Sequence, residues 1–211
     1  MDLDPDRKLA LVYVPAGTRP AVEALWRLDV AFAAILATGT QPMISQLRLA
    51  WWREALERLD HAPPPAEPVL QALAAHVLPV VSGAALAAME EGWLQLLPDE
   101  ALTADGLADY AELRGGLLFA YTARLLGNAE FPVADAGKAW ALADLARHSR
   151  RVGEIKSPPR GAKTKWPREL RPLGMLAMLA RRDLERPGEE PEKQGSPARI
   201  MRMIRHRLSG Y

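Results

Sequence analysis

The chain has 211 residues, of which 49% are hydrophobic and 25% are charged, and this composition is typical of a globular protein rather than a disordered one. It contains no cysteine, which excludes a disulfide scaffold, a cysteine-based zinc site, an iron–sulfur cluster and a thiol nucleophile. The longest wholly apolar run, residues 30–37, is much shorter than the ~20 residues of a membrane-spanning helix. The acidic start is also unlike a signal peptide, so we expect one cytoplasmic domain over residues 1–211.

Charge is distributed unevenly along the chain. Residues 1–146 contain 10 basic and 19 acidic side chains, a net charge of −9, whereas residues 147–211 contain 17 basic and 7 acidic ones, a net charge of +10. Two explanations are open: the two parts neutralise each other within the fold, or the basic part faces an anionic surface or ligand.

Apolar residues recur at helical spacing almost throughout, and segments with the alternating pattern of strands are nearly absent. The sequence therefore predicts an all-α protein. The expected helices cover residues 18–38, 42–59, 67–78, 83–97, 104–126, 133–152, 167–186 and 196–208. In the second helix we expect an inner apolar stripe made of Met43, Leu47, Ala50, Trp51 and Ala55. Composition predicts a mobile basic loop at residues 155–167 and a linker at residues 187–195.

Residue types alone reveal no catalytic motif. The four histidines lie in different expected elements, and no two have the i, i+4 spacing that brings two imidazoles to one metal. The chain contains neither of the phosphate-binding patterns GxGxxG and GxxxxGKS/T, and it has no GxSxG nucleophile elbow.

Five stretches form a recognisable series along the chain. They are residues 6–15 (DRKLALVYVP), 19–25 (RPAVEAL), 46–56 (QLRLAWWREAL), 110–127 and 137–152. This series resembles the squalene/phytoene synthase family, whose second long helix bears a similar Trp-Trp-Arg block. The resemblance covers residues 5–152 and, more weakly, residues 167–208. It implies an isoprenoid synthase-like helical bundle, truncated after its second motif helix because the chain is shorter than the family's enzymes.

The resemblance also shows what this chain has lost. In the family's enzymes, two facing helices each present an aspartate-rich motif that holds Mg²⁺ on the diphosphate of the substrate. Here the lost motif positions fall on Ala33, Ala34 and Ala37 in the first helix and on His148, Arg151 and Val152 in the second. Of the second motif, only Arg147 is retained. Since cationic side chains in place of acids repel a divalent metal, we expect no catalytic residue and no bound metal.

Two aspartates, Asp29 and Asp144, lie one helical turn before lost acids. They could form a displaced metal site, but one carboxylate per helix supplies few of the oxygens that Mg²⁺ requires. In the alternative interpretation, Asp144 pairs with Arg147 or His148, and Asp29 pairs with an arginine of a facing helix.

The resemblance implies a set of candidate ligand-binding residues around the former site. They are Trp26, Asp29, Trp51, Trp52, Arg53, Tyr110, Asp144 and Arg147. The tryptophans either line a cavity for an isoprenoid or another apolar ligand, or they pack in the core.

The C-terminal part offers a second candidate surface. Its last expected helix is basic and amphipathic, so the apolar side either packs on the body or lies on an anionic membrane. The cations predicted to contact an anionic partner, either lipid headgroups or an acidic protein face, are Lys156, Arg160, Lys163, Lys165, Arg168 and Arg171. Because the basic residues are not interleaved with aromatic ones, nucleic acid is not expected as a partner.

Two functions remain as hypotheses. The first is a catalytically degenerate family member that acts as a binding or assembly factor for a membrane-associated respiratory complex. Under this hypothesis we expect no cofactor, a protein partner, and a cytoplasmic location at the periphery of the inner membrane. Residues 6–56 are also similar to the family's mitochondrial branch, a complex I assembly factor that likewise lacks the aspartates. The alternative is a prenyltransferase that condenses isoprenoid diphosphates through the displaced site and needs Mg²⁺.

Overall fold

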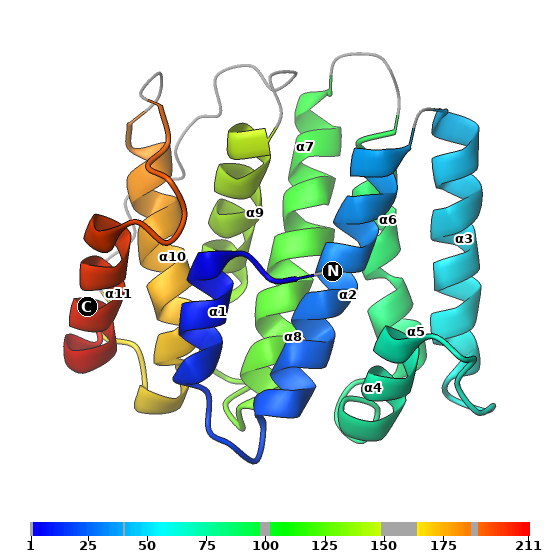
Figure 1. The fold of residues 1–211 in the computed structure, drawn as a ribbon, viewed down its shortest axis with the longest axis horizontal. Helices are drawn as coiled ribbons and strands as arrows, with labels where there is room; N and C mark the ends of the chain where they lie inside the picture. Colours follow the sequence, from blue (N-terminus) through cyan, green and yellow to red (C-terminus); the bar gives the residue numbers. More distant parts are fainter. Residues whose placement is uncertain (1, 40, 98–101, 149–163, 187–189) are drawn as a thin grey trace.

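The structure is a computed structural model that describes residues 2–39, 41–97, 102–148, 164–186 and 190–211. All regular elements in these ranges are helices, which confirms the prediction of an all-α protein. Figure 1 shows most of them side by side and upright, with α11 (Pro197–Ser209) and α3 (Pro42–Arg58) at opposite edges. None of the described helices is both long enough and apolar enough to cross a membrane.

From α2 onward the helices follow one another in the order that the sequence predicts, and they are preceded by α1, which is not among the expected helices. The remaining elements are α1 (Pro5–Val12), α2 (Arg19–Thr38), α4 (Pro68–His76), α5 (Gly83–Ala87), α6 (Met89–Leu94), α7 (Ala104–Tyr110), the π-helical turn η1 (Ala111–Gly116), α8 (Leu117–Leu125), α9 (Ala134–His148), the 3₁₀ turn η2 (Arg168–Leu170) and α10 (Arg171–Leu184). Side-chain caps explain where several of the helices begin. At α1, the Asp4 carboxylate accepts hydrogen bonds from the backbone N–H groups of Asp6 and Arg7, each at 3.0 Å.

Some expected boundaries differ from the observed ones. The expected helix 83–97 is divided into α5 and α6 at Ala88. The expected helix 104–126 is a continuous run whose middle turn is π-helical. The basic loop at residues 155–167 and the last turn of helix 133–152 lie mostly outside the described residues.

The expected inner stripe of α3 is wrong. Met43, Leu47 and Trp51 are 73%, 67% and 47% exposed, and Ala50 is only half-buried, whereas Ala55 is buried as expected. The buried face is formed by Ser45, Leu49, Ala55 and Leu56. The helix is apolar on two faces, so periodicity did not identify the face that packs inward.

The core is built around α2. Leu25, Trp26, Leu28 and Phe32 are at most 1% exposed, and the buried apolar side chains of the described residues form one contiguous cluster. The N–H of the Trp26 indole donates to the Thr122 hydroxyl on α8 at 3.0 Å. This arrangement leaves Asp29, midway along α2, completely buried.

Candidate functional site

Four charged side chains from four elements meet at the centre of the bundle. Asp29 on α2 accepts hydrogen bonds from Arg114 of η1 (Nε to Oδ1, 2.8 Å; Nη2 to Oδ2, 3.1 Å) and from Arg7 of α1 (Nη1 to Oδ2, 2.8 Å). The Nη2 group of Arg114 also donates to Asp144 Oδ2 on α9 at 2.7 Å. We call Arg7, Asp29, Arg114 and Asp144 the central ion network. The guanidinium of Arg114 bridges α2 and α9, the two helices on which the sequence analysis placed the motif positions.

Aromatic rings surround the guanidinium of Arg114. Its Cζ atom lies 4.3 Å from the ring centroid of Trp93, 4.9 Å from that of Trp140 and 5.5 Å from that of Tyr110. Arg114 also donates to the Tyr110 hydroxyl. Cation–π contacts of this kind strengthen when they are shielded from water, and Arg114 is only 1% exposed. The arginine is therefore held in one position from several sides.

The π-helical turn and two glycines bring Arg114 to this place. A Cβ atom on Gly115 would lie 2.1 Å from the carbonyl oxygen of Gly137, and one on Gly137 would lie equally close to that of Gly115. Only glycines therefore allow η1 and α9 to approach so closely. Single π-helical turns of this kind occur often at functional sites.

The charges in the central ion network stabilise one another. Burial alone would raise the pKa of Asp144, but the charges of Arg114 and Arg7 outweigh burial and lower it. Burial would likewise lower the pKa of Arg114, yet Asp29, Tyr110 and Asp144 raise it well above its usual value. The ionised forms of Arg114 and Asp144 are consequently favoured by their mutual contact.

These residues do not fit the Mg²⁺–diphosphate group that the family implies. Both carboxylate oxygens of Asp29 accept guanidinium hydrogen bonds, and Asp144 contributes one oxygen to Arg114 while the other lies 3.5 Å from His148 Nδ1. Among the described residues, no group of three or more metal-ligating side chains comes together. The three expected motif positions beyond Asp29 are Ala33, Ala34 and Ala37, whose side chains supply no ligand.

A second cluster ties the C-terminal helices to the body. Arg199 of α11 donates to Asp6 of α1 at 2.8 Å and to both oxygens of Asp183 of α10 at 2.9 Å. Arg147 of α9 donates to Asp183 at 2.8 Å. We call Asp6, Arg147, Asp183 and Arg199 the C-terminal ion network. Part of the basic section is thus neutralised within the fold, as one of the two explanations for the charge asymmetry expected.

A small cavity lies between the two networks. Its volume is about 20 Å³, and its walls include Asp4, Trp140, Ala143, Asp144, Leu176 and Asp183. A space of this size holds a single water molecule, which is far below the several hundred Å³ of a typical ligand pocket. This cavity does not accommodate an isoprenoid chain.

The structure separates the candidate ligand-binding residues into different environments. Tyr110 and Asp144 lie together at the central ion network, while Trp26 is a core residue paired with Thr122. Trp51 faces solvent, and Trp52 packs edge-on against Phe32 with a centroid distance of 5.9 Å. Arg53 is half-buried on α3, and Arg147 belongs to the C-terminal ion network.

The positions that the sequence analysis assigned to the lost motifs lie at the margin of the same region, where they are described. Ala33 and Ala34 are half-buried, and Ala37 and His148 are exposed, each one or two turns beyond the aspartate on its own helix. Arg151 and Val152 lie outside the described residues. Asp29 pairs with an arginine of a facing helix, as one interpretation expected. Asp144 pairs with Arg114 and approaches His148, whereas its expected partner Arg147 turns to Asp183.

The predicted anionic-partner residues are only partly described. Lys165 and Arg168 are exposed, whereas Arg171 donates to the backbone carbonyls of Arg207 and Leu208 at 2.9 and 3.0 Å and so caps the end of α11. Lys156, Arg160 and Lys163 lie outside the described residues.

Sequence reasoning missed the arginines that organise the site. Arg7 and Arg114 stand within the stretches that carry the family resemblance, but nothing in their spacing indicates burial. The available signal was Asp29 itself, because an acid among the apolar residues of a helix face requires a cationic partner when it is buried.

An all-α bundle in which two helices direct acidic side chains toward a shared buried centre has the architecture of the isoprenoid synthases. Residues 2–156 match the family model for squalene/phytoene synthase. The match covers more than two thirds of the chain, so the chain belongs to the squalene/phytoene synthase family and has its isoprenoid synthase-like fold. No curated protein and no solved structure matches the chain in the same comparisons.

Proposed function

We propose that this chain is a catalytically degenerate member of the family that acts as a binding or assembly factor. The observation that carries the proposal is the position of the Arg114 guanidinium, which donates to Asp29 at 2.8 and 3.1 Å and to Asp144 at 2.7 Å. A permanent organic cation thus lies between the two acids that a displaced metal site would need.

Metal-dependent ionisation of a prenyl diphosphate would require Arg114 to leave this position. Breaking a buried ion pair by removing one partner costs about 3–5 kcal/mol, and Arg114 would also lose its contacts with Trp93 and Trp140. Two carboxylates would then still leave most of the coordination shell of Mg²⁺ to water. The geometry therefore disfavours the alternative, a prenyltransferase that acts through Asp29 and Asp144.

The partner that we propose is a protein of a membrane-associated respiratory complex, bound on the cytoplasmic side of the inner membrane. This part of the proposal rests on the resemblance to the family's assembly-factor branch, since the fold alone does not define a partner. An isoprenoid or another apolar molecule is a second candidate ligand, but the cavity between the two ion networks is too small for it.

The test combines deletion of the gene with complementation by two versions of the chain. The wild type and Asp144→Asn should both restore the amount of assembled complex, since the amide of the variant still accepts a hydrogen bond from Arg114 but is a poor metal ligand. An enzyme that works through the displaced site would instead lose function in Asp144→Asn.

A second measurement addresses catalysis directly. The purified chain, incubated with Mg²⁺ and farnesyl or geranylgeranyl diphosphate, should release no pyrophosphate, and its melting temperature should not rise. Mg²⁺-dependent pyrophosphate release that disappears in Asp144→Asn would establish the prenyltransferase and overturn the proposal.

A further inference from the structure

The outer side of α11 is apolar at the point farthest from the core. Arg199, Met203 and His206 form the buried side of the helix. Met201 and Leu208, on the opposite side, are 68% and 75% exposed. A helix that packs on a protein body normally turns polar residues outward, so these two apolar side chains form an exposed ridge on the outer side of α11.

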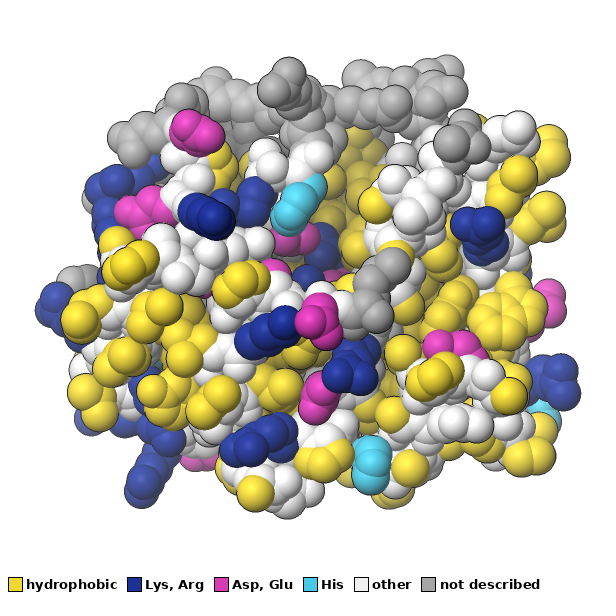
Figure 2. All heavy atoms as spheres, in the orientation of Figure 1, with side chains coloured by type: hydrophobic (Ala, Val, Ile, Leu, Met, Phe, Trp, Pro, Cys, Tyr) yellow, Lys and Arg dark blue, Asp and Glu magenta, His cyan; other side chains and the backbone are white. Residues whose placement is uncertain are grey.

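An exposed aromatic residue follows the end of α11. Tyr211 is 59% exposed, and the Nζ atom of Lys165 lies 5.9 Å from its ring centroid. Figure 2 shows hydrophobic side chains gathered over α11 and α1 on this face, with Lys and Arg along the left and lower margins. The surface is the outside of an edge helix rather than a groove.

Cations without acidic partners flank this ridge. Helix α11 contains four arginines and no acid. Arg199 and Arg202 are paired with Asp6, Asp183 and Glu192. Arg205 and Arg207 form no ion pair within the described part of the chain, and neither do Lys165 and Arg168, which precede α10.

These cations are close enough to one another to interact. The backbone N–H of Trp166 donates to the backbone carbonyl of Gly210 at 2.9 Å. Residues 165–168 therefore lie against the C-terminal end of α11. Burial and the positive charges of Arg171 and Arg168 lower the pKa of Arg207. The Nε atom of Arg207 is buried and has no hydrogen-bond partner among the described residues. An anion placed here would relieve this repulsion.

We propose that α11, together with residues 165–168, is a docking surface for a bilayer that contains anionic phospholipids. Met201 and Leu208 enter the interfacial region, and Lys165, Arg168, Arg205 and Arg207 contact headgroup phosphates. A convex apolar ridge with cations beside it matches a flat anionic interface. An acidic protein helix would instead need a groove. The proposal does not depend on the state of the central ion network, and it names the surface by which the proposed assembly factor meets the membrane.

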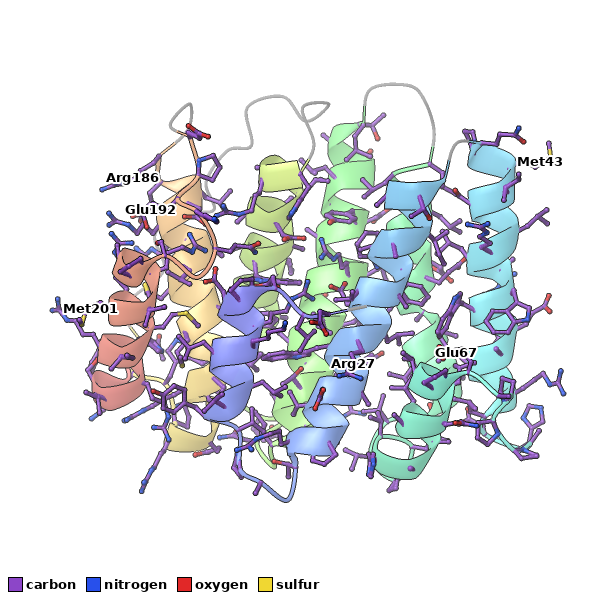
Figure 3. The ribbon with its side chains drawn as sticks, in the orientation of Figure 1. Arg27, Met43, Glu67, Arg186, Glu192 and Met201 are labelled. Atoms are coloured by element: carbon purple, nitrogen blue, oxygen red, sulfur yellow. The ribbon has the colours of Figure 1, made fainter. Side chains whose placement is uncertain are left out.

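Because the chain contains no cysteine, a single introduced cysteine can be labelled specifically in the first experiment. Met201→Cys and Met43→Cys each introduce a single thiol for an environment-sensitive fluorophore. The two methionines are similarly exposed, at 68% and 73%, and lie at opposite edges of the bundle (Figure 3). With vesicles of phosphatidylcholine and phosphatidylglycerol in equal parts, the label at position 201 should shift to shorter wavelength and the label at position 43 should not.

The second experiment measures co-sedimentation of the full chain with the same vesicles. Each cation near an anionic surface contributes about 1 kcal/mol, so Arg168→Glu with Arg205→Glu should weaken binding at least about tenfold at low salt. Arg48→Glu with Arg58→Glu, two exposed arginines of α3, gives the same change in net charge and should bind like the wild type. Neutral phosphatidylcholine vesicles and high salt should both abolish binding.

Three outcomes would overturn the proposal. No binding to anionic vesicles would leave an acidic protein as the partner of the ridge. Equal weakening by both charge variants would show that net charge, not this surface, drives binding. Equal shifts of the two labels would place the membrane contact elsewhere. None of these results would affect the complementation test, so the proposed function stands or falls separately.

Discussion

Replacement of Arg114 by methionine removes the residue on which the central ion network depends. The variant keeps the length and much of the volume of the side chain, but it leaves Asp29, which is 0% exposed, with Arg7 as its remaining cationic partner. Removal of one partner from a buried pair costs about 3–5 kcal/mol, and the retained Arg7 favours the lower end of that range. For a chain of this size, a loss of about 3 kcal/mol lowers the melting temperature by about 6–12 °C.

Urea unfolding of the wild type, Arg114→Met, Asp29→Asn and the double variant would measure this effect. Because the two residues share hydrogen bonds, the loss in the double variant should be smaller than the sum of the single losses by about 0.5–3 kcal/mol. Arg27→Met is the matched control, since Arg27 and Glu23 form an exposed pair, 48% and 35% accessible, for which less than about 1 kcal/mol is expected. The reasoning would be refuted if Arg114→Met lowered the free energy of unfolding no more than Arg27→Met does. It would also be refuted if the effects of Arg114→Met and Asp29→Asn were strictly additive in the double variant.

Three further predictions concern packing and pH. Gly115→Ala should destabilise the chain by about 3 kcal/mol or more in thermal unfolding, because its Cβ would lie 2.1 Å from the Gly137 carbonyl oxygen. Gly17→Ala, which meets nothing within 4 Å, should leave the melting temperature almost unchanged. Trp26→Phe removes the hydrogen bond to Thr122 and should cost about 1–3 kcal/mol in urea unfolding. Burial, aided by the charge of Arg171, lowers the pKa of His206, so stability is full above about pH 6.5 and is lost as pH falls toward the folded-state pKa. The urea midpoint should therefore drop between pH 7.5 and 5.5 in the wild type and drop less in His206→Phe.

Most of the helices from α2 onward were predictable from the sequence because the apolar periodicity and the capping residues agree, whereas α1 was not among the expected helices. For the inner stripe of α3, periodicity was insufficient, since Met43, Leu47 and Trp51 repeat as regularly as the buried Leu49 and Leu56. Burial depends on which neighbours a helix acquires, and an edge helix has few of them.

The candidate site was predictable only in part. Asp29 required a buried cation, but Arg114 is 85 residues away and reaches it from a π-helical turn that changes the direction of its side chain. Arg147 has the spacing to pair with Asp144 within one helix, yet it bonds to Asp183 because Arg114 already occupies Asp144. Competition between two arginines for one aspartate, when one of them comes from a distant part of the chain, cannot be predicted from the local sequence.

The contacts of α1 bear on the order in which the helices pack during folding. Adjacent residues of α1, Asp6 and Arg7, belong to the C-terminal and the central ion network respectively, and the contact of Asp6 with Arg199 joins residues 193 positions apart. During synthesis, Arg199 follows Asp6 by 193 residues, so α1 can meet α11 only after the helices between them have been made. Until Arg199 has been made, Asp6 lacks its arginine partner, and the C-terminal ion network lacks one of its two arginines. The contacts of α2 to α9 with one another can thus form before those of α10 and α11 with α1, which join residues far apart in the sequence and form late in folding.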